Sequence, residues 1–585
     1  MEQFLSREGV AALEQGLSAP GGENGCAALV TLAWHLRQRD CPRALALATQ
    51  ADALLAGMDE GASERRRLSA RLALVRGEIS LLFDDLEAAQ RCAQAAATAF
   101  AEIDDAIGEG DTHWLQASIG LNQGQGDHVE ACLNLAMGEY RRGADPLRVQ
   151  AAQARQLVYA AFRDTAGAAA SLERLFPLGQ SQPASVLAWL AAARANVGGL
   201  TGNPGMAIKH GLEAYQAARD SGQLRQALVS VTNAAESIAT MGDLDAALEW
   251  SERAVALARR TGWPAIVGFC LMQLGDALRQ IARHDEARAL LQEALALVER
   301  QSGSRNYAQV LGSLGQLALE QGDHADALVW FARLGAHAHV HLEPDLLIKA
   351  GRGQASALVH LGRAQEARHM AEVALNLARE QGDAQGQIQM HAVLANMHAK
   401  HSLSEPAEMT APTPALHHLK QALRIAADID GYTVAPELFT QLAAAHAVVG
   451  NYRSAYDCTL SSEAARSKRH TEEAKKRALA MQIRNEVEHA RAETELHRQL
   501  AATLQESTAT LEILGAVGRE ITASLDAQAV FAALHRHVQE LLDATVFAVY
   551  LIGDDGATLH TAFGVEAGVN LPARSVPIDL SLIHI

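Results

Sequence analysis

Aromatic residues are scarce in this chain, because Phe, Trp and Tyr make up only 4% of its 585 residues. β-Sandwiches and barrels rely on aromatic and β-branched side chains, so this scarcity disfavours them as the main architecture. Alanine and leucine are abundant instead, which favours closely packed helices. The length exceeds what one hydrophobic core normally covers, and it predicts a repeat array or several domains.

Cysteines and positive charge are also sparse. The chain carries a formal net charge of −18, which disfavours nucleic acid as a partner, because no basic face is available to neutralise phosphates. No two cysteines form a Cys-x-x-Cys pair or another metal-ligand spacing, so buried apolar roles are expected for them. They are Cys26, Cys41, Cys92, Cys132, Cys270 and Cys458.

Targeting and membrane signals are missing as well. Residues Met1 to Leu17 contain acidic side chains and no apolar stretch of signal-peptide length, and no run approaches the length of a membrane span. We therefore expect a cytoplasmic protein without membrane insertion.

Signatures of catalysis and of cofactor binding are lacking too. There is no Walker loop, no GxSxG and no HExxH motif, and we expect no cofactor and no catalytic residue in this sequence. Gly351-Arg352-Gly353 lies in a helical pattern rather than after a strand, which argues against a dinucleotide fingerprint. His337, His339 and His341 alternate in what we expect to be a surface loop, where no carboxylate or cysteine is spaced to complete a metal site.

What the chain does contain is a set of small residues that recur with a period of 40, which we call the comb. Each repeat has a short turn followed by an alanine, and further small residues lie seven positions after and twelve positions before that alanine. The alanines are Ala207, Ala247, Ala287, Ala327 and Ala367; the later positions are Ala214, Ala254, Ala294 and Ala374, with Leu334 as the exception; the earlier positions are Ala195, Ala235, Gly275, Gly315 and Ala355. Small residues let two helices of a hairpin approach closely, and stacked hairpins share a continuous core.

The positions of these residues resemble the tetratricopeptide repeat. Leu274-Gly275 in a first helix, followed by Ala287, Leu291 and Ala294 in a second, follow that motif. The period is 40 rather than 34, and the motif's early Trp and terminal Pro are mostly missing, so longer helices are expected. Looser copies extend the pattern in both directions and predict an all-α solenoid of about eleven hairpins over residues 1–465.

A change of composition follows the array. Residues 466–510 carry charges of both signs without Gly or Pro. A seam of mostly apolar residues can be drawn at steps of three and four from Ala480 to Leu511, although Thr494, His497 and Thr508 pack poorly in such a seam. This spacing predicts a linker helix that forms a coiled-coil homodimer, and a solvated helix lying on the array is the alternative.

Residues 511–579 change character again. A helix is expected from Ala527 to Leu542, a strand from Thr545 to Ile552, and a second strand from Ala557 to Val565, after the Asp554-Asp555-Gly556 turn. This layout resembles the first half of a GAF domain. The final residues 580–585 fit a translated sequencing adapter, and we expect them to be a non-native tail that replaced the rest of the gene.

The combined plan resembles bacterial sensory proteins, which usually continue into a GGDEF diguanylate cyclase and less often into a histidine kinase. The resemblance implies a signalling protein whose array binds a protein or peptide partner and relays that state to an output domain. A non-enzymatic interaction scaffold remains the alternative. Counting from the comb, the expected partner-binding residues on the concave face are Asn196, Asn233, Glu236, Asp276, Arg279, Gln316, Arg352 and Ser356.

Overall fold

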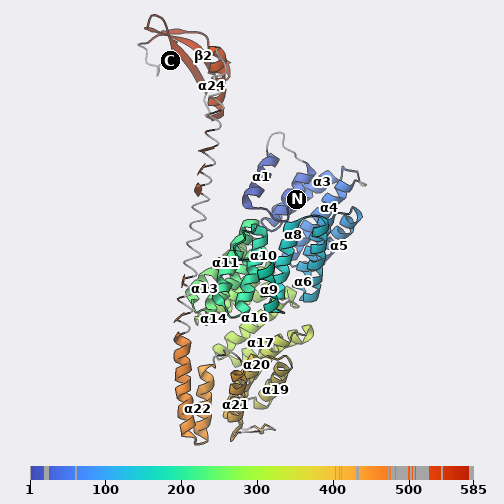
Figure 1. The fold of residues 1–585 in the computed structure, drawn as a ribbon, viewed down its shortest axis with the longest axis vertical. Helices are drawn as coiled ribbons and strands as arrows, with labels where there is room; N and C mark the ends of the chain where they lie inside the picture. Colours follow the sequence, from blue (N-terminus) through green and yellow to red (C-terminus); the bar gives the residue numbers. More distant parts are fainter. Residues whose placement is uncertain are drawn as a thin grey trace. The chain divides into compact units, whose positions relative to one another are not determined.

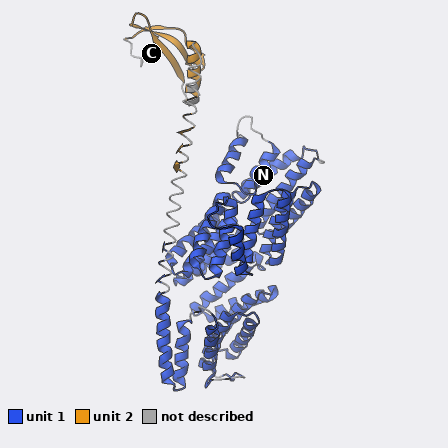
Figure 2. Cartoon of the chain, viewed as in Figure 1, with its two compact units in different colours: residues 1–485 blue, residues 486–585 orange. Residues whose placement is uncertain are grey.

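The structure is a computed structural model with two compact units, residues 1–485 and 486–585 (Figure 2). The residues that it describes are 2–18, 25–59, 62–401, 403–406, 409, 411–429, 432, 434–471, 526–541 and 545–578, with a few helical positions between 474 and 515. Most of the expected linker helix and the adapter-like residues 580–585 lie outside these described residues.

The first unit is a stack of antiparallel helical hairpins behind a leading helix α1 (Arg7–Ser18) (Figure 1). The hairpins of its first half are α2 (Cys26–Leu36) with α3 (Cys41–Leu55), α4 (Ser63–Leu82) with α5 (Leu86–Glu102), α6 (Ala106–Asn122) with α7 (Gly126–Arg142), α8 (Pro146–Ala160) with α9 (Thr165–Leu175), and α10 (Ala184–Leu200) with α11 (Pro204–Ser221).

The second half continues in the same way. Its hairpins are α12 (Leu224–Thr240) with α13 (Leu244–Thr261), α14 (Pro264–Gln280) with α15 (His284–Val298) and the short helix η1 (Glu299–Gln301), α16 (Arg305–Glu320) with α17 (His324–His341), α18 (Pro344–His360) with α19 (Ala364–Glu380), and α20 (Ala384–Lys400) with α21 (Pro414–Ala427). Finally, α22 (Pro436–Val448) is linked to helical residues 452–471 by a hydrogen bond that Ser462 donates to the Pro436 carbonyl and by one between the Ser462 and Thr440 hydroxyls. The expected solenoid of helical hairpins is confirmed.

The small residues of the comb lie where two helices cross. A Cβ added to Gly275 of α14 would lie 2.9 Å from the Cγ of Leu291 in α15, and one added to Gly315 would lie 2.8 Å from Cε2 of Phe331. Ala287 and Ala327 are completely buried in the second helices. Close packing of this kind leaves no room for larger side chains, which explains the 40-residue period of small residues.

The array also coils back on itself, so that hairpins far apart in sequence touch. Arg39 Nη2 donates to the carbonyl of Asp220 at 3.2 Å, and the backbone N–H of Arg225 donates to Gln38 Oε1 at 3.1 Å. Asp84 accepts a hydrogen bond from the N–H of Ala265 at 3.1 Å. These contacts join residues 181 to 187 positions apart, which is between four and five repeats of the comb.

The second unit pairs a helix with a small antiparallel sheet. Its elements are α24 (Ala527–Leu541), β1 (Val546–Ile552), β2 (Thr558–Glu566), β3 (Val569–Asn570) and β4 (Ser575–Pro577). Strand β2 pairs with β1, β3 and β4, whereas β1 pairs only with β2 among the residues that the structure describes. The helix and the first two strands were expected. The short β3 and β4 were not, because two or three residues show no periodicity.

One expectation about a loop is wrong. His337, His339 and His341 lie in the last turns of helix α17, and the His337 side chain is buried against Tyr307 rather than exposed. Glu343, just after the helix, brings Oε2 to 3.5 Å from His337 Nδ1, although no acidic partner was expected there. Within the described residues, no helix combines the length and the apolarity needed to cross a bilayer.

Candidate functional site

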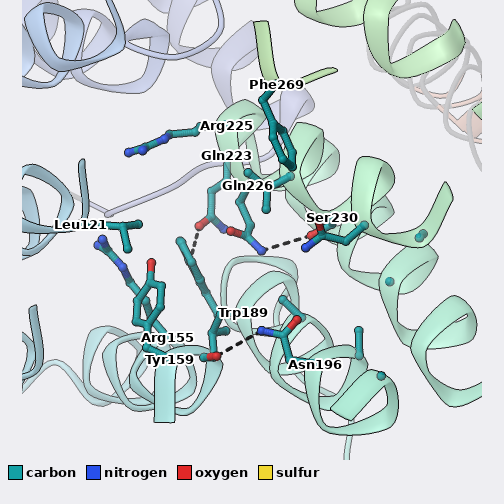
Figure 3. A pocket seen from close by; sticks show the side chains of 18 of the residues that line it. Leu121, Arg155, Tyr159, Trp189, Asn196, Gln223, Arg225, Gln226, Ser230 and Phe269 are labelled. Carbon is teal, nitrogen blue, oxygen red and sulfur yellow. Dashed lines mark hydrogen bonds between the residues drawn. The ribbon is translucent and has the colours of Figure 1, made fainter. Parts of the chain in front are cut away.

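The first turn of the coiled array encloses a cavity of about 770 Å³ (Figure 3). Its walls come mainly from the first helices of successive hairpins, α4, α6, α8, α10 and α12, because these helices face the inside of the coil. Phe4 from the N-terminal segment and Phe269 from α14 also line it. A cavity of this size is in the range of ligand-binding pockets.

Two tryptophans and an arginine make up one wall of the cavity. The rings of Trp114 and Trp189 meet edge to face at 5.6 Å, and Phe4 packs on Trp114 at 6.2 Å. The Arg155 guanidinium lies 4.4 Å from the Trp114 ring and 5.1 Å from the Trp189 ring. Stacking of this kind holds a cation in place and leaves an amphipathic surface toward the cavity.

Hydrogen bonds fix the orientation of these groups. Arg155 donates to the Trp114 carbonyl at 3.2 Å and to the Ser118 hydroxyl at 2.8 Å, while its buried Nε has no partner among the described residues. Trp189 Nε1 donates to Gln223 Oε1 at 2.6 Å, and the Gln223 amide donates in turn to the carbonyl of Ser185. These hydrogen bonds hold Arg155 and Trp189 in their orientation toward the cavity.

A second arginine reaches the cavity from α12. Arg225 donates to Asn122 Oδ1 at 2.5 Å, and its side chain is half-buried. Burial lowers the pKa of its guanidinium; nearby Tyr159 opposes this effect, and the positive charge of Arg155 lowers the pKa further. Neither arginine forms an ion pair with any residue that the structure describes.

Amide and hydroxyl side chains line the remaining surface. Asn196 donates to the carbonyl of Val158 at 3.1 Å, and Gln226 donates to Ser230 at 3.1 Å. Glu236 accepts from Gln273 at 3.3 Å. Its carboxylate reaches solvent, but desolvation by the surrounding concave wall raises its pKa, and Asp276 adds to the increase. Such groups can hydrogen-bond both the N–H and the C=O of an extended peptide.

The expected partner-binding residues divide into two groups in the structure. Asn196, Asn233 and Glu236 all line the cavity. The other five lie farther along the array on α14, α16 and α18, and four of them bond to protein groups: Asp276 to Arg279 and Ser313, Arg279 to Glu320, Gln316 to Glu320, and Arg352 to Gln389, while Ser356 is half-buried on α18.

The most prominent cavity residues were not identified from the sequence. Trp114, Arg155, Trp189 and Arg225 lie where the repeat spacing is looser or at positions outside the comb. The signal that could have identified them is the rarity of tryptophan, because two of only six tryptophans in the chain line this cavity. As for metals, no group of three or more His, Cys, Asp or Glu within the described residues is arranged to hold an ion.

Comparison with known proteins agrees with the repeat pattern. Residues 269–334 match the family model described as "Tetratricopeptide repeat". No curated protein matches this sequence significantly.

Several solved structures of helical repeat proteins are similar to this chain. A Rap protein complexed with competence and sporulation factor is 13% identical, with a TM-score of 0.46 over 62% of this chain and 99% of that one. The apo quorum sensor NprR from B. thuringiensis is 12% identical, with a TM-score of 0.45 over 63% of this chain and 99% of that one. A putative kinesin light chain from Podospora anserina is 16% identical, with a TM-score of 0.29 over 35% and 99%. Likeness at this level says nothing about what this chain binds.

Proposed function

We propose that this chain is a cytoplasmic signalling protein whose repeat array binds a peptide or an extended protein segment in the cavity of about 770 Å³. The single observation that carries the proposal is the composition of this cavity. Stacked aromatic rings line it together with amide and hydroxyl groups, and this combination suits an extended backbone with apolar side chains.

The proposed relay runs from the array toward the C-terminal unit. Helical residues 452–471 pair with α22 at the end of the array and lead into the segment expected to form the linker helix. The helix and sheet of the second unit are compatible with the start of a GAF domain. An output domain would follow, most simply a diguanylate cyclase or else a histidine kinase. A non-enzymatic scaffold is the competing function.

Peptide capture tests the binding function. The immobilised chain is incubated with a pool of random-sequence octapeptides, and the retained peptides are identified by mass spectrometry. We expect Asn233→Trp, which fills the cavity from an exposed position of α12, to abolish retention, while Ala256→Trp on the exposed face of α13 leaves it unchanged. Equal retention by both variants would place binding elsewhere on the array.

Light scattering tests the proposed homodimer. The chain should have the mass of two copies in solution, and deletion of residues Glu472 to Gln505 should reduce it to one copy, because most of the proposed seam lies within the deleted segment. A shortened chain that stays dimeric would assign the contact to the array or to the C-terminal unit.

A further inference from the structure

Arg155 and Arg225 lie on the same side of the cavity, beside Leu121 and Tyr159 (Figure 3). Their side chains come from α8 and α12, and their positive charges repel each other. The described hydrogen bonds of the two side chains go to neutral groups. Arg155 bonds to the Trp114 carbonyl and to Ser118, and Arg225 bonds to Asn122. Two buried or half-buried guanidinium groups without a carboxylate are unusual in a chain of net charge −18.

The two acidic groups whose charges act on Arg225, Glu78 and Asp84, are already engaged with other partners. Glu78 forms an ion pair with Arg37 at 2.6 Å and accepts a hydrogen bond from Gln38 at 2.5 Å. Asp84 accepts from the backbone N–H of Ala265. Both raise the pKa of Arg225 only from a distance, and less than burial lowers it. The corner between the two arginines therefore keeps a positive charge.

The surroundings of this corner are apolar. Leu121 and Phe162 are both more than one-third exposed although they line the cavity, and Trp114 and Trp189 form the adjoining wall. An anion that enters here places its neighbouring atoms against these side chains. The site therefore suits a ligand that carries an apolar group next to its negative charge.

We propose that this arginine corner, formed by Arg155 and Arg225, binds a carboxylate of the peptide ligand that stands next to an apolar residue. The proposal rests on the proposed peptide-binding function and specifies the ligand's chemistry. A carboxylate carries one negative charge and matches guanidinium donors. A phosphate would bring about two negative charges toward a corner that already has Glu78 and Asp84 nearby.

The test compares two hexapeptide libraries that differ at one position, where one has the carboxylate of Glu and the other the carboxamide of Gln. Each peptide has Leu followed by Glu or Gln at its centre, four randomised flanking positions, an acetylated N-terminus and an amidated C-terminus. Retention on the immobilised chain is measured for the wild type, for Arg225→Gln and for Arg260→Gln, which changes an exposed arginine of α13. Thermal melting confirms that each variant is folded.

We expect the wild type and Arg260→Gln to retain the Glu library at least about tenfold more strongly, because a charge-assisted hydrogen bond stabilises binding by about 1.5–3 kcal/mol. Arg225→Gln should lose this preference. Equal retention of both libraries by the wild type, or a preference that persists in Arg225→Gln, overturns the carboxylate site but leaves peptide binding intact. Displacement of the Glu library by inorganic phosphate assigns the corner to free anions and also overturns it. If the wild type retains neither of the two libraries, that result contradicts the peptide-binding function itself.

Discussion

The turns inside five regular hairpins each pass through a residue with positive φ. Four of them use glycine, at Gly202, Gly242, Gly322 and Gly362, and the fifth uses Ala282 with φ of 60°. An L-residue with a Cβ costs about 1–2 kcal/mol in this left-handed region, whereas glycine adopts it freely. At the residue scale, Ala282 is thus a position where the sequence departs from its own repeat.

We predict that Ala282→Gly stabilises the hairpin of α14 and α15 by about 1 kcal/mol. Amide hydrogen exchange should show slower opening in these two helices, since repeat arrays unfold locally. The matched control is Ala256→Gly in the exposed interior of α13, which should destabilise its helix by about 1 kcal/mol. Faster exchange in the Ala282→Gly variant would contradict the backbone argument.

At the scale of elements, helices α20 and α21 bury a cluster of histidines between them. The Nδ1 atoms of His391 and His418 lie 3.1 Å apart, and the rings of His398 and His417 contact His418. Burial lowers the pKa of His391 to about 4 and that of His418 to about 3. The positive charges of Arg379 and Arg424, and those that the other rings acquire on protonation, add to these decreases.

This cluster should make the α20–α21 hairpin sensitive to acid. The folded pKa values lie below the unfolded value of about 6.5, so the unfolded state binds more protons and stability falls as the pH drops below about 6.5. The limiting loss is about 1.4 kcal/mol per pH unit and per ring, until the folded pKa is reached.

Urea unfolding at pH 7 and pH 5 measures this effect. We predict that His418→Leu loses less stability between the two pH values than the wild type does, because one titrating ring is removed. His369→Leu changes an exposed histidine of α19 and should behave like the wild type. An identical pH dependence in all three chains would show that the buried rings do not titrate on unfolding.

Strand β1 is the long strand that has one partner among the described residues. It pairs there with β2 only, and Val546, Leu551 and Ile552 are more than half exposed. A short sheet with an open apolar edge has marginal stability in water, and the open edge tends to pair with strands of other molecules. We predict that amide exchange in Val546–Ile552 is faster than in the repeat helices, and protection equal to theirs would mean that the edge is covered.

At the scale of the whole molecule, closure of the coil depends on a tight contact at Gly222. This glycine has φ of 79°, and a Cβ there would lie 2.3 Å from Nε of Arg39, which holds the carbonyls of Leu5 and Asp220. Gly262 ends the next hairpin with φ of 67°, but its nearest atom, in Phe83, is 4.0 Å away.

We predict that Gly222→Ala destabilises the array more than Gly262→Ala does. Both substitutions place a Cβ in the left-handed region at a cost of about 1–2 kcal/mol. Only the first also displaces Arg39, which should loosen the cavity and weaken peptide retention. Urea unfolding and peptide capture measure the two effects, and equal losses in both variants would show that the Arg39 contact does not hold the coil closed.

Much of the local structure followed from the sequence alone. The 40-residue comb identified the hairpins, the crossings at Gly275 and Gly315, and the turns before Ala247 and Ala327, because helix spacing, capping and small-residue packing act over a few residues. The β-branched and aromatic composition of Val546–Ile552 identified its strand, because strand propensity is also a local property. Short-range rules determine these elements wherever they occur in a chain.

The cavity depended on tertiary structure. Its enclosure requires Gln38 and Arg39 to meet Asp220 and Arg225, and this distance along the chain is set by small rotations that accumulate over several stacked hairpins. No local pattern encodes that sum. The structure alone therefore brought Trp114, Arg155 and Trp189 together with Arg225, whereas the sequence placed only Asn196, Asn233 and Glu236 near the same surface.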